Sequence, residues 1–483
     1  MAHRPTVIHG ADLSAHLAAL RAELHVPGEF PPAVLADAAS TWSRAHREDH
    51  TALPLRTLDP PGSRDLDQAF HIERSAAGWR VHYAIADVAA FVDPDGPVAA
   101  EAKVRGETIY LPDGRAPVYP PELSEGAASL LPDAERPAVL WILDLDSAGE
   151  LRRVDVRRSI VRSRAQLDYL TLEETDPAVA ADLRLIGELR QQRERARGGV
   201  SLNVPEQQVT YADGEWVVTY RSPQPSEGWN AQLSLLTGMA AASMMLDAKI
   251  GLLRVMPGPQ RSTLGSLRRS AAALDVAWPS GTRYADVVRD LDPNVPTQAA
   301  MLRLASVLFR GARYVAFNGE QPLQRMHAAV AAPYAHATAP LRRLADRYVS
   351  EICVSVCAQR RGEDHPVPQW VQRDLPALPE LMDHADQHAH QLDRAVVDLA
   401  ETMLLADRVG EEFAGVIVEA DDDHGEIQLR APAVRARIDG TDLPLGHDVL
   451  ATLTTADVAT RRVRFTLDAR PDPPASPEHV PSG

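Results

Sequence analysis

The feature that most constrains the fold is the separation of strand-like and helix-like sequence along the chain. Between about residues 51 and 166, apolar β-rich runs alternate with turn residues, and 81–92 and 138–146 have the composition of buried strands. Beyond about residue 179 the sequence is mainly helical, apart from a predicted hairpin over 209–221. The expected helices cover 179–196, 228–249, 297–317, 339–361 and 377–410. This segregation predicts an α+β fold.

Residues 412–470 return to strand-like sequence. They contain five short runs of strand character, which is the number and size expected of an OB-type β-barrel. The first 50 residues predict two short helices, over 11–24 and 33–45, and the Pro-rich tail predicts disorder. The expected organisation is a short helical region over 1–50, a main domain over 51–411, a barrel over 412–470 and a disordered tail over 471–483.

The composition bounds the class of protein. The net charge of −17 is not the basic footprint usual for nucleic-acid binders, although a local basic groove can exist within an acidic protein. The two cysteines, Cys353 and Cys357, are too few for a disulfide framework and indicate a reducing compartment. There is no apolar leader, no membrane-length apolar run and no P-loop. We expect a cytoplasmic monomer without membrane contact or nucleotide cofactor.

An acidic cluster is the main candidate for chemistry. Asp59, Asp65 and Asp67 fall within nine residues, and a Pro-Pro-Gly-Ser turn between them can bring Asp59 back towards the other two. Converging carboxylates repel one another and favour cations, and Mg²⁺ prefers oxygen ligands. Two such ions can activate water and stabilise the leaving oxygen in phosphodiester hydrolysis. Taken alone, the same residues are more typical of an acidic surface turn than of a metal site.

Further motifs resolve this ambiguity by their order. The segments Thr57-Leu58-Asp59 and Asp65-Leu66-Asp67-Gln68-Ala69 resemble the catalytic motif of the RNB domain in the RNase II/RNase R family of exoribonucleases. The resemblance continues, in the family's order, through Ile85–Val88, Tyr110–Pro112, Pro120–Ser124, Gly198–Glu206 and Tyr334–Arg343. It spans roughly residues 50–360, and the C-terminal barrel occupies the place of the family's RNA-binding OB domain. The resemblance therefore implies an RNB-type mixed sheet with packed helices, followed by an OB-fold barrel.

The resemblance also implies a function and roles for individual residues. The expected activity is hydrolytic 3′→5′ decay of single-stranded RNA to nucleoside 5′-monophosphates and a short limit oligonucleotide. Asp59, Asp65 and Asp67 correspond to the aspartates that hold one or two Mg²⁺ ions, with Mn²⁺ as an alternative, and Gln68 is a fourth candidate ligand. Arg342 corresponds to the arginine that contacts the scissile phosphate, a task suited to a permanently charged guanidinium. The expected RNA-channel residues are Tyr110, Leu202, His327, Tyr334, His336, Thr338 and Arg343.

Several positions depart from the family's pattern. Gln68 stands where the family usually has a fourth aspartate, which predicts weaker metal affinity, and Leu202 replaces a phenylalanine that stacks on a base. Ala231 and Gln232 replace an acidic pair, for which Glu227 is a candidate substitute or else a helix N-terminal residue. The family's N-terminal cold-shock barrels are expected to be missing, which predicts poorer decay of structured RNA.

These departures keep open a second function, an RNB-fold protein that binds RNA with weakened catalysis. A weaker alternative is an endonuclease or other phosphodiesterase that uses the same metal pair. Decay of end-labelled RNA distinguishes them.

Overall fold

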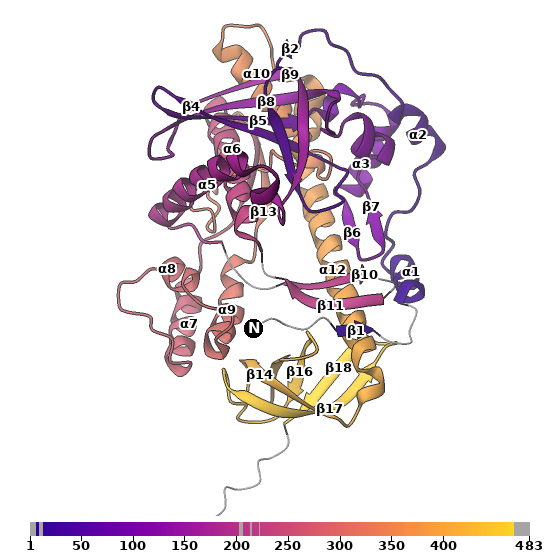
Figure 1. The fold of residues 1–483 in the computed structure, drawn as a ribbon, viewed down its shortest axis with the longest axis vertical. Coiled ribbons are helices and arrows are strands. Elements are labelled where there is room, and N and C mark those ends of the chain that lie inside the picture. The colour runs from indigo at the N-terminus through magenta and orange to yellow at the C-terminus, as the bar shows by residue number, and fades with distance from the viewer. Residues whose placement is uncertain (1–5, 9–12, 202–205, 213–214, 222, 468–483) are drawn as a thin grey trace, which may run out of the picture.

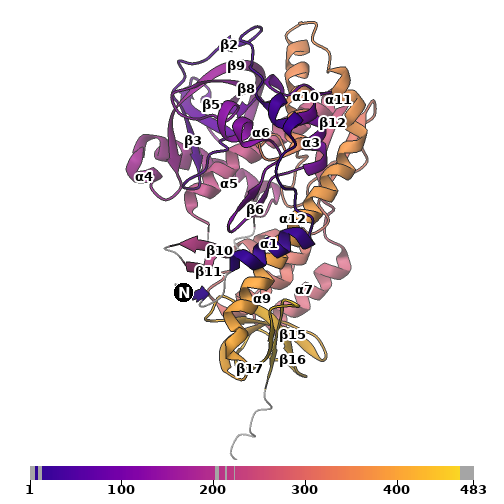
Figure 2. The same cartoon turned by 90° about the vertical axis from the view of Figure 1, so that its right-hand side faces the viewer.

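The computed structural model describes residues 6–8, 13–201, 206–212, 215–221 and 223–467. Its elements form a large body that contains the main sheet and a smaller barrel, and the long helix α12 (Leu378–Leu405) runs from one to the other (Figures 1 and 2). The predicted tail over 471–483 and the position Leu202 lie outside the described residues. No helix among the described residues is long and apolar enough to cross a membrane.

The main sheet is mixed, as expected. Its hydrogen-bonded order is β2-β9-β3-β4-β5-β8, and β8 also pairs with β9, so the series of strands returns on itself. Strands β2 and β3 run parallel to β9, whereas the other pairs are antiparallel. The bounds are β2 (Glu48–Asp49), β3 (Leu55–Asp59), β4 (Gln68–Ser75), β5 (Gly78–Ala86), β8 (Glu135–Asp146) and β9 (Leu151–Asp168).

Helices pack on this sheet because their buried faces and the strands share one hydrophobic core. In α6 (Pro225–Ala248), Leu233, Ala241 and Met245 are fully buried in that core. Helix α10 (Leu344–Arg360) is almost completely buried as far as Ala358. The other elements of the body are α2 (Pro32–Ala38), α3 (Pro97–Arg105), β6 (Ile109–Leu111), β7 (Gly114–Ala116), α4 (Leu172–Thr175), α5 (Pro177–Arg197) and α11 (Gln369–Asp374).

The predicted hairpin is present and acquires a third strand. Strand β10 (Glu206–Ala212) pairs with β11 (Glu215–Arg221), and β11 pairs in turn with β1 (Thr6–Ile8). The first 50 residues therefore contain the two expected short helices, α1 (Leu13–Glu23) and α2, and in addition the strands β1 and β2, which the sequence did not predict. The β1-β11-β10 sheet lies between the body and the barrel (Figure 1).

The expected helix over 297–317 was also wrong in its second half. Helix α9 (Pro296–Ala305) ends in a 3₁₀ turn over Ser306–Phe309, and Gly311 follows with φ of +84°. That left-handed conformation suits glycine and stops the helix. Residues Arg313–Asn318 then form β13, which pairs with β12 (Ile250–Val255). Two further helices that the sequence did not predict, α7 (Arg261–Ala273) and α8 (Tyr284–Arg289), pack near α9.

The C-terminal strands form the expected closed five-stranded barrel. The order is β14-β15-β16-β18-β17, and it closes by pairing of β14 with β17. The buried side chains of Ile417, Ile438 and Phe465 lie in its core. The bounds are β14 (Glu412–Ala420), β15 (His424–Leu429), β16 (Arg435–Asp439), β17 (Asp448–Asp457) and β18 (Arg462–Thr466). An OB-type barrel thus follows the mixed-sheet body.

Candidate active site

The acidic motif connects two neighbouring strands of the main sheet. Asp59 is the last residue of β3 and Gln68 is the first of β4, and these strands are antiparallel neighbours. A turn at Pro60–Ser63, in which Gly62 has φ of +81°, starts the return of the chain. The loop is anchored by Ser129, whose hydroxyl accepts from Leu66 N–H at 3.0 Å and donates to the Arg64 carbonyl at 2.6 Å. The loop therefore returns Asp65 and Asp67 to the strand ends that carry Asp59 and Gln68.

Asp67 is the most deeply buried aspartate of the motif, with 1% of its surface exposed. Its Oδ1 accepts from Leu341 N–H at 2.7 Å, and its Oδ2 accepts from Arg342 Nε at 2.6 Å. Burial raises the pKa of Asp67 to about 7, although Arg342 and the Leu341 amide act in the opposite direction and Asp65 adds to the rise. One arginine thus does not offset the cost of placing this carboxylate in the interior.

Asp65 and Asp59 lie beside this pair in different environments. Asp65 Oδ2 accepts from the Tyr110 hydroxyl at 2.8 Å, and its Oδ1 lies 3.3 Å from Arg115. Asp59 Oδ2 is buried without a hydrogen-bond partner. Burial raises the pKa of Asp59 to about 6, with Arg342 lowering it and Asp65 raising it further. The site therefore contains more negative charge than its arginines neutralise.

Gln68 is held by hydroxyl groups from two distant elements. Its Oε1 accepts from the Tyr83 hydroxyl on β5 and, at 3.4 Å, from the Ser234 hydroxyl on α6. The amide oxygen that the sequence offered as a metal ligand is therefore already an acceptor of two hydrogen bonds. Sequence reasoning missed Tyr83 and Ser234, because only the pairing of β4 with β5 and the packing of α6 bring them to position 68.

A cavity of about 360 Å³ lies next to these residues. Six of the residues predicted from the sequence line this cavity, namely Gln68, Tyr110, Tyr334, Thr338, Arg342 and Arg343. The other lining residues are Glu107, Thr108, Ser234 and Ala339. The Arg342 side chain is 39% exposed, so its guanidinium is accessible from the cavity. Arg343 is fixed by a two-point ion pair with the fully buried Asp346, at 2.7 and 2.8 Å. Both arginines are thus placed at the cavity by carboxylates behind them.

His327 and His336 form an aromatic cluster with Tyr334. The Tyr334 ring packs edge-on against both, at centroid distances of 5.8 and 5.5 Å, and Tyr314 OH lies 2.6 Å from His336 Nδ1. Burial lowers the pKa of His327 to about 4, and burial together with Arg343 and Arg254 lowers that of His336. At neutral pH these histidines are therefore uncharged and cannot contribute cationic contacts to a phosphate.

Glu227 has a structural use. Its carboxylate accepts from Gln224 N–H at 2.9 Å in a capping box at the start of α6 and pairs with Arg221. Gln232, one of the residues that replace the family's acidic pair, donates to Glu194 at 2.6 Å in the interior. The geometry therefore favours Glu227 as a helix-terminal residue rather than as a substitute for that pair.

The donor chemistry of the site fits a hard cation. Asp59 Oδ2 has no hydrogen-bond partner. For both Asp59 and Asp67, burial raises the pKa by more than the positive charge of Arg342 lowers it. Among the described residues no three His, Cys, Asp or Glu side chains are grouped to hold one ion. Mg²⁺ does not require such a group, because it is usually held by one or two carboxylates with water and substrate phosphates.

Comparison with known proteins identifies the family. Residues 47–358 match the RNB domain, and residues 411–468 match the RNase II-type exonuclease C-terminal S1 domain. The chain belongs to the RNB-domain family of ribonucleases.

Individual relatives are distant in sequence. The chain is 26% identical to Ribonuclease R of Escherichia coli (strain K12) over 403 residues, which cover 78% of this chain and 49% of that protein. It is 28% identical over 416 residues to exosome complex exonuclease RRP44 homolog A of Arabidopsis thaliana, covering 80% of this chain and 43% of that protein. The chain thus spans about half the length of the curated relatives that it matches.

Solved structures share the fold. Mycoplasma genitalium RNase R, in complex with ribose-methylated single-stranded RNA, superposes with a TM-score of 0.84 at 20% identity, over 94% of this chain and 78% of that one. Yeast Ssd1, a pseudonuclease, has a TM-score of 0.71 at 16% identity, over 93% and 59% of the two chains. At these identities the likeness concerns the architecture alone.

Proposed function

We propose that this protein is a magnesium-dependent, hydrolytic 3′→5′ exoribonuclease. It degrades single-stranded RNA to nucleoside 5′-monophosphates and a short limit oligonucleotide. The observation that carries the proposal is the contact between Asp67 and Arg342 at the cavity, with Asp59 and Asp65 beside it, in a chain of the RNB-domain family. A cytoplasmic, monomeric protein remains the prediction from the sequence.

In this proposal Arg342 binds the scissile phosphate. Its Nε is held by Asp67, which orients the guanidinium plane while part of the group stays accessible from the cavity. A guanidinium fixed in this way can donate two further hydrogen bonds to phosphate oxygens and stabilise the negative charge that develops there. Arg343, fixed by Asp346, adds a second positive charge at the same cavity.

The aspartates would hold the metal. Asp59, Asp65 and Asp67 are the candidate ligands, and Mg²⁺ would supply an activated water and neutralise the leaving oxygen. Asp67 also positions Arg342, so one carboxylate connects the metal site to the phosphate site. Asp65 positions the Tyr110 ring because its carboxylate accepts a hydrogen bond from the Tyr110 hydroxyl.

Tyr110 supports the assignment of an RNA path. It lines the catalytic cavity and also a larger cleft of about 1110 Å³ between the hairpin, α9, α12 and the barrel. The residues that line this cleft include four arginines, Arg303, Arg310, Arg394 and Arg435. An RNA strand that runs from the cleft past Tyr110 would place its end at Arg342. This arrangement favours release of terminal nucleotides. The ring of Tyr110 would contact the terminal nucleotides and influence the length of the limit product.

The alternative is an RNA-binding protein with weakened catalysis. It is favoured by Gln68, whose amide oxygen is already engaged by Tyr83 and Ser234, and by the fact that the fold also occurs in a pseudonuclease. Asp67 and Arg342 argue against it, because a site released from selection for catalysis has no reason to keep a buried, poorly compensated carboxylate.

One assay separates the candidates. Single-stranded RNA labelled at its 5′ end is incubated with the protein and Mg²⁺. The proposal predicts a ladder that shortens to a limit oligonucleotide, with no large internal fragments. Internal fragments would support an endonuclease, and intact RNA that is nevertheless bound would support the weakened binder.

A further inference from the structure

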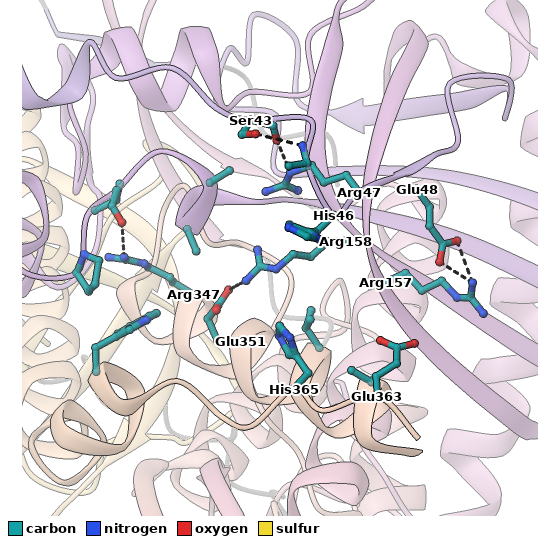
Figure 3. Close-up of a pocket in the computed structure, with 18 of the residues that line it drawn as sticks. Ser43, His46, Arg47, Glu48, Arg157, Arg158, Arg347, Glu351, Glu363 and His365 are labelled. Atoms are coloured by element: carbon teal, nitrogen blue, oxygen red, sulfur yellow. Dashed lines mark hydrogen bonds and ion pairs between the residues drawn. The ribbon is translucent and has the colours of Figure 1, made fainter. Parts of the chain in front are cut away.

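A second cavity, of about 660 Å³, lies apart from the catalytic site. It is formed by the segment before β2, the loop after β5, β9, α10 and the loop that follows α10, and no residue of the catalytic cavity lines it (Figure 3). Its most distinctive feature is the number of arginines among its lining residues: Arg47, Arg157, Arg158, Arg347 and Arg361. The proposed RNA chemistry uses none of these residues.

The two arginines at the outer edge are neutralised by nearby carboxylates. Arg157 pairs with Glu48 at 2.7 Å and with Asp155 at 2.7 Å. Arg361 pairs with Asp155 at 2.6 Å and with Glu363 at 2.6 Å. This part of the wall therefore has two guanidinium groups and three carboxylates, so any local surplus of positive charge is confined to the inner part of the cavity.

The inner three arginines outnumber their acidic partners. Arg47 and Arg158 share Asp87, at 2.8 and 2.6 Å, and Arg158 also pairs with Glu351. Figure 3 shows Glu351 between Arg158 and Arg347. Arg347 donates to the Val92 carbonyl at 2.7 Å, and among the described residues no carboxylate lies within ion-pair distance of it. Three guanidinium groups therefore face two carboxylates.

Two of these arginines also carry buried N–H groups without acceptors. Arg47 Nη1 and Arg347 Nε have no hydrogen-bond partner, although the Arg47 side chain is 6% exposed and Arg347 is 2% exposed. Buried polar groups of folded proteins nearly always have partners. Both residues line the cavity, so the inner arginines lie next to these unsatisfied donors, which are themselves buried behind the cavity wall.

Much of the remaining wall is apolar, although Ser43, His46 and His365 also line the cavity. Ala89, Ala90 and Val92 follow β5, Val354 and Ala358 belong to α10, and Trp370 belongs to α11. The Trp370 ring is covered by the Arg347 guanidinium at 4.7 Å from the ring centroid. A ligand that fits this cavity therefore combines a negatively charged group with an apolar or planar part.

We propose that this cavity is a binding site for a small phosphorylated organic molecule. Its phosphate would lie against Arg47, Arg158 and Arg347, and its organic part against the alanine and valine wall. Phosphate suits these arginines because it offers several acceptor oxygens and up to two negative charges to guanidinium groups that lack them. The volume is within the range of about 300–1,000 Å³ that is usual for small-molecule sites. The site is independent of the proposed nuclease activity.

Calorimetric titration of the full chain tests the site, with EDTA present to remove metal from the catalytic residues. The probes are adenosine 5′-monophosphate, inorganic phosphate and adenosine. The proposal expects one molecule of the monophosphate to bind per chain and adenosine to bind at least about tenfold more weakly, since adenosine lacks the charged group. Phosphate that binds as tightly as the monophosphate would support the anion site with free phosphate as its ligand.

Two variants locate the binding. Ala89→Phe fills the cavity and removes no charge, because Ala89 is a partly buried lining residue, and Arg47→Gln removes one donor while Arg158 still pairs with Asp87. Each should weaken binding at least about tenfold. Arg184→Gln, an exposed arginine on α5, and Arg342→Ala in the catalytic cavity should leave binding within about twofold, since neither residue lines this cavity.

Several results would overturn the proposal. They are no binding of either phosphate-containing probe, equal binding of adenosine, loss of binding in Arg342→Ala but not in Ala89→Phe, and binding of RNA oligonucleotides alone. Thermal unfolding of each variant shows whether it is folded, and the two cavity variants change the site in different ways. Intact binding in a folded Ala89→Phe chain therefore contradicts the proposal even where Arg47→Gln is unstable.

Discussion

Asp67 and Asp87 are two buried aspartates from adjoining parts of the main sheet, and they differ in how their charge is compensated. They are 1% and 2% exposed. The Asp67 carbonyl accepts from Ala86 N–H, the residue just before Asp87. Asp67 has one arginine and a neighbouring carboxylate, and burial raises its pKa to about 7. Asp87 is buried as deeply, but Arg158 and Arg47 outweigh the effect of burial and lower its pKa.

Under the proposed function, this difference separates a catalytic carboxylate from a structural one. Asp87 is fully ionised at neutral pH and its charge stabilises the two arginines that surround it, so it has no need of another cation. Asp67 lies among carboxylates that together exceed the positive charge of Arg342, so a cation would relieve it.

Asp67→Asn should abolish RNA decay. The amide can still accept from Leu341 N–H, but it loses the charge that would hold the metal and orient Arg342. We expect RNA decay to slow by roughly a thousandfold or more, while RNA binding is retained. Stability should change little, because the Arg342 side chain is 39% exposed and keeps contact with water. Decay at more than a tenth of the wild-type rate would remove Asp67 from the catalytic assignment.

Asp87→Asn should have the opposite result and is the matched control. It leaves Arg47 and Arg158 with too little negative charge in the interior, which should lower the free energy of unfolding by about 3–5 kcal/mol. RNA decay per folded molecule should remain close to that of the wild type. Urea unfolding and a decay assay under native conditions measure the two effects. A stable Asp87→Asn chain that has lost decay would break the distinction.

Gln68→Asp should lower the requirement for Mg²⁺. The glutamine oxygen is occupied by the Tyr83 and Ser234 hydroxyls and carries no charge, whereas an aspartate adds negative charge at the site. The Mg²⁺ concentration for half-maximal decay should fall by about tenfold. Gln192→Asp, an exposed glutamine on α5, makes the same change away from the site and should not shift it. A Mg²⁺ requirement that is identical in wild type and Gln68→Asp would refute the weaker-metal hypothesis.

Glu401 is a third buried carboxylate, and it lines neither the catalytic cavity nor the arginine-rich cavity. It accepts from Gln207 at 2.6 Å and from Arg435 N–H at 2.7 Å, and burial raises its pKa to about 8. The folded chain thus keeps a proton that the unfolded chain releases above about pH 4.5. Unfolding between about pH 4.5 and 8 releases this proton, so the contribution of Glu401 to stability decreases as the pH rises through that range.

Glu401→Gln should flatten this pH dependence. The free energy of unfolding, measured by urea titration at several pH values from 5 to 8, should fall less steeply with pH in the variant than in the wild type. Equal slopes would mean that Glu401 is ionised in the folded chain and is compensated in the same way as Asp87.

The parts of the fold that the sequence predicted are those with local signals. The barrel strands and the turn that returns Asp59 towards Asp65 follow from short-range patterns and turn residues. The helix over 297–317 was misassigned because the apolar run continues through β13, and only its pairing with β12 makes it a strand. Local sequence does not contain that partner.

The environment of the site depends on distant contacts and was less predictable. The residues of the motif were identifiable, but the hydroxyls that occupy Gln68 come from β5 and α6. Likewise, the ion pairs beside the second cavity join Arg47, Asp87, Arg158 and Glu351 from four separate segments, none of which has a recognisable motif. Such charge balances become visible only when the fold brings the side chains together.

The most direct test of the central claim is the chemistry of the released product. Single-stranded RNA is digested by the wild-type chain with Mg²⁺ in ¹⁸O-labelled water, and the small products are analysed by mass spectrometry. Hydrolysis from the 3′ end breaks the bond between phosphorus and the 3′ oxygen of the preceding nucleotide. The proposed function predicts nucleoside 5′-monophosphates that carry one ¹⁸O in the phosphate. Unlabelled products, larger internal fragments or no mononucleotides at all would contradict it.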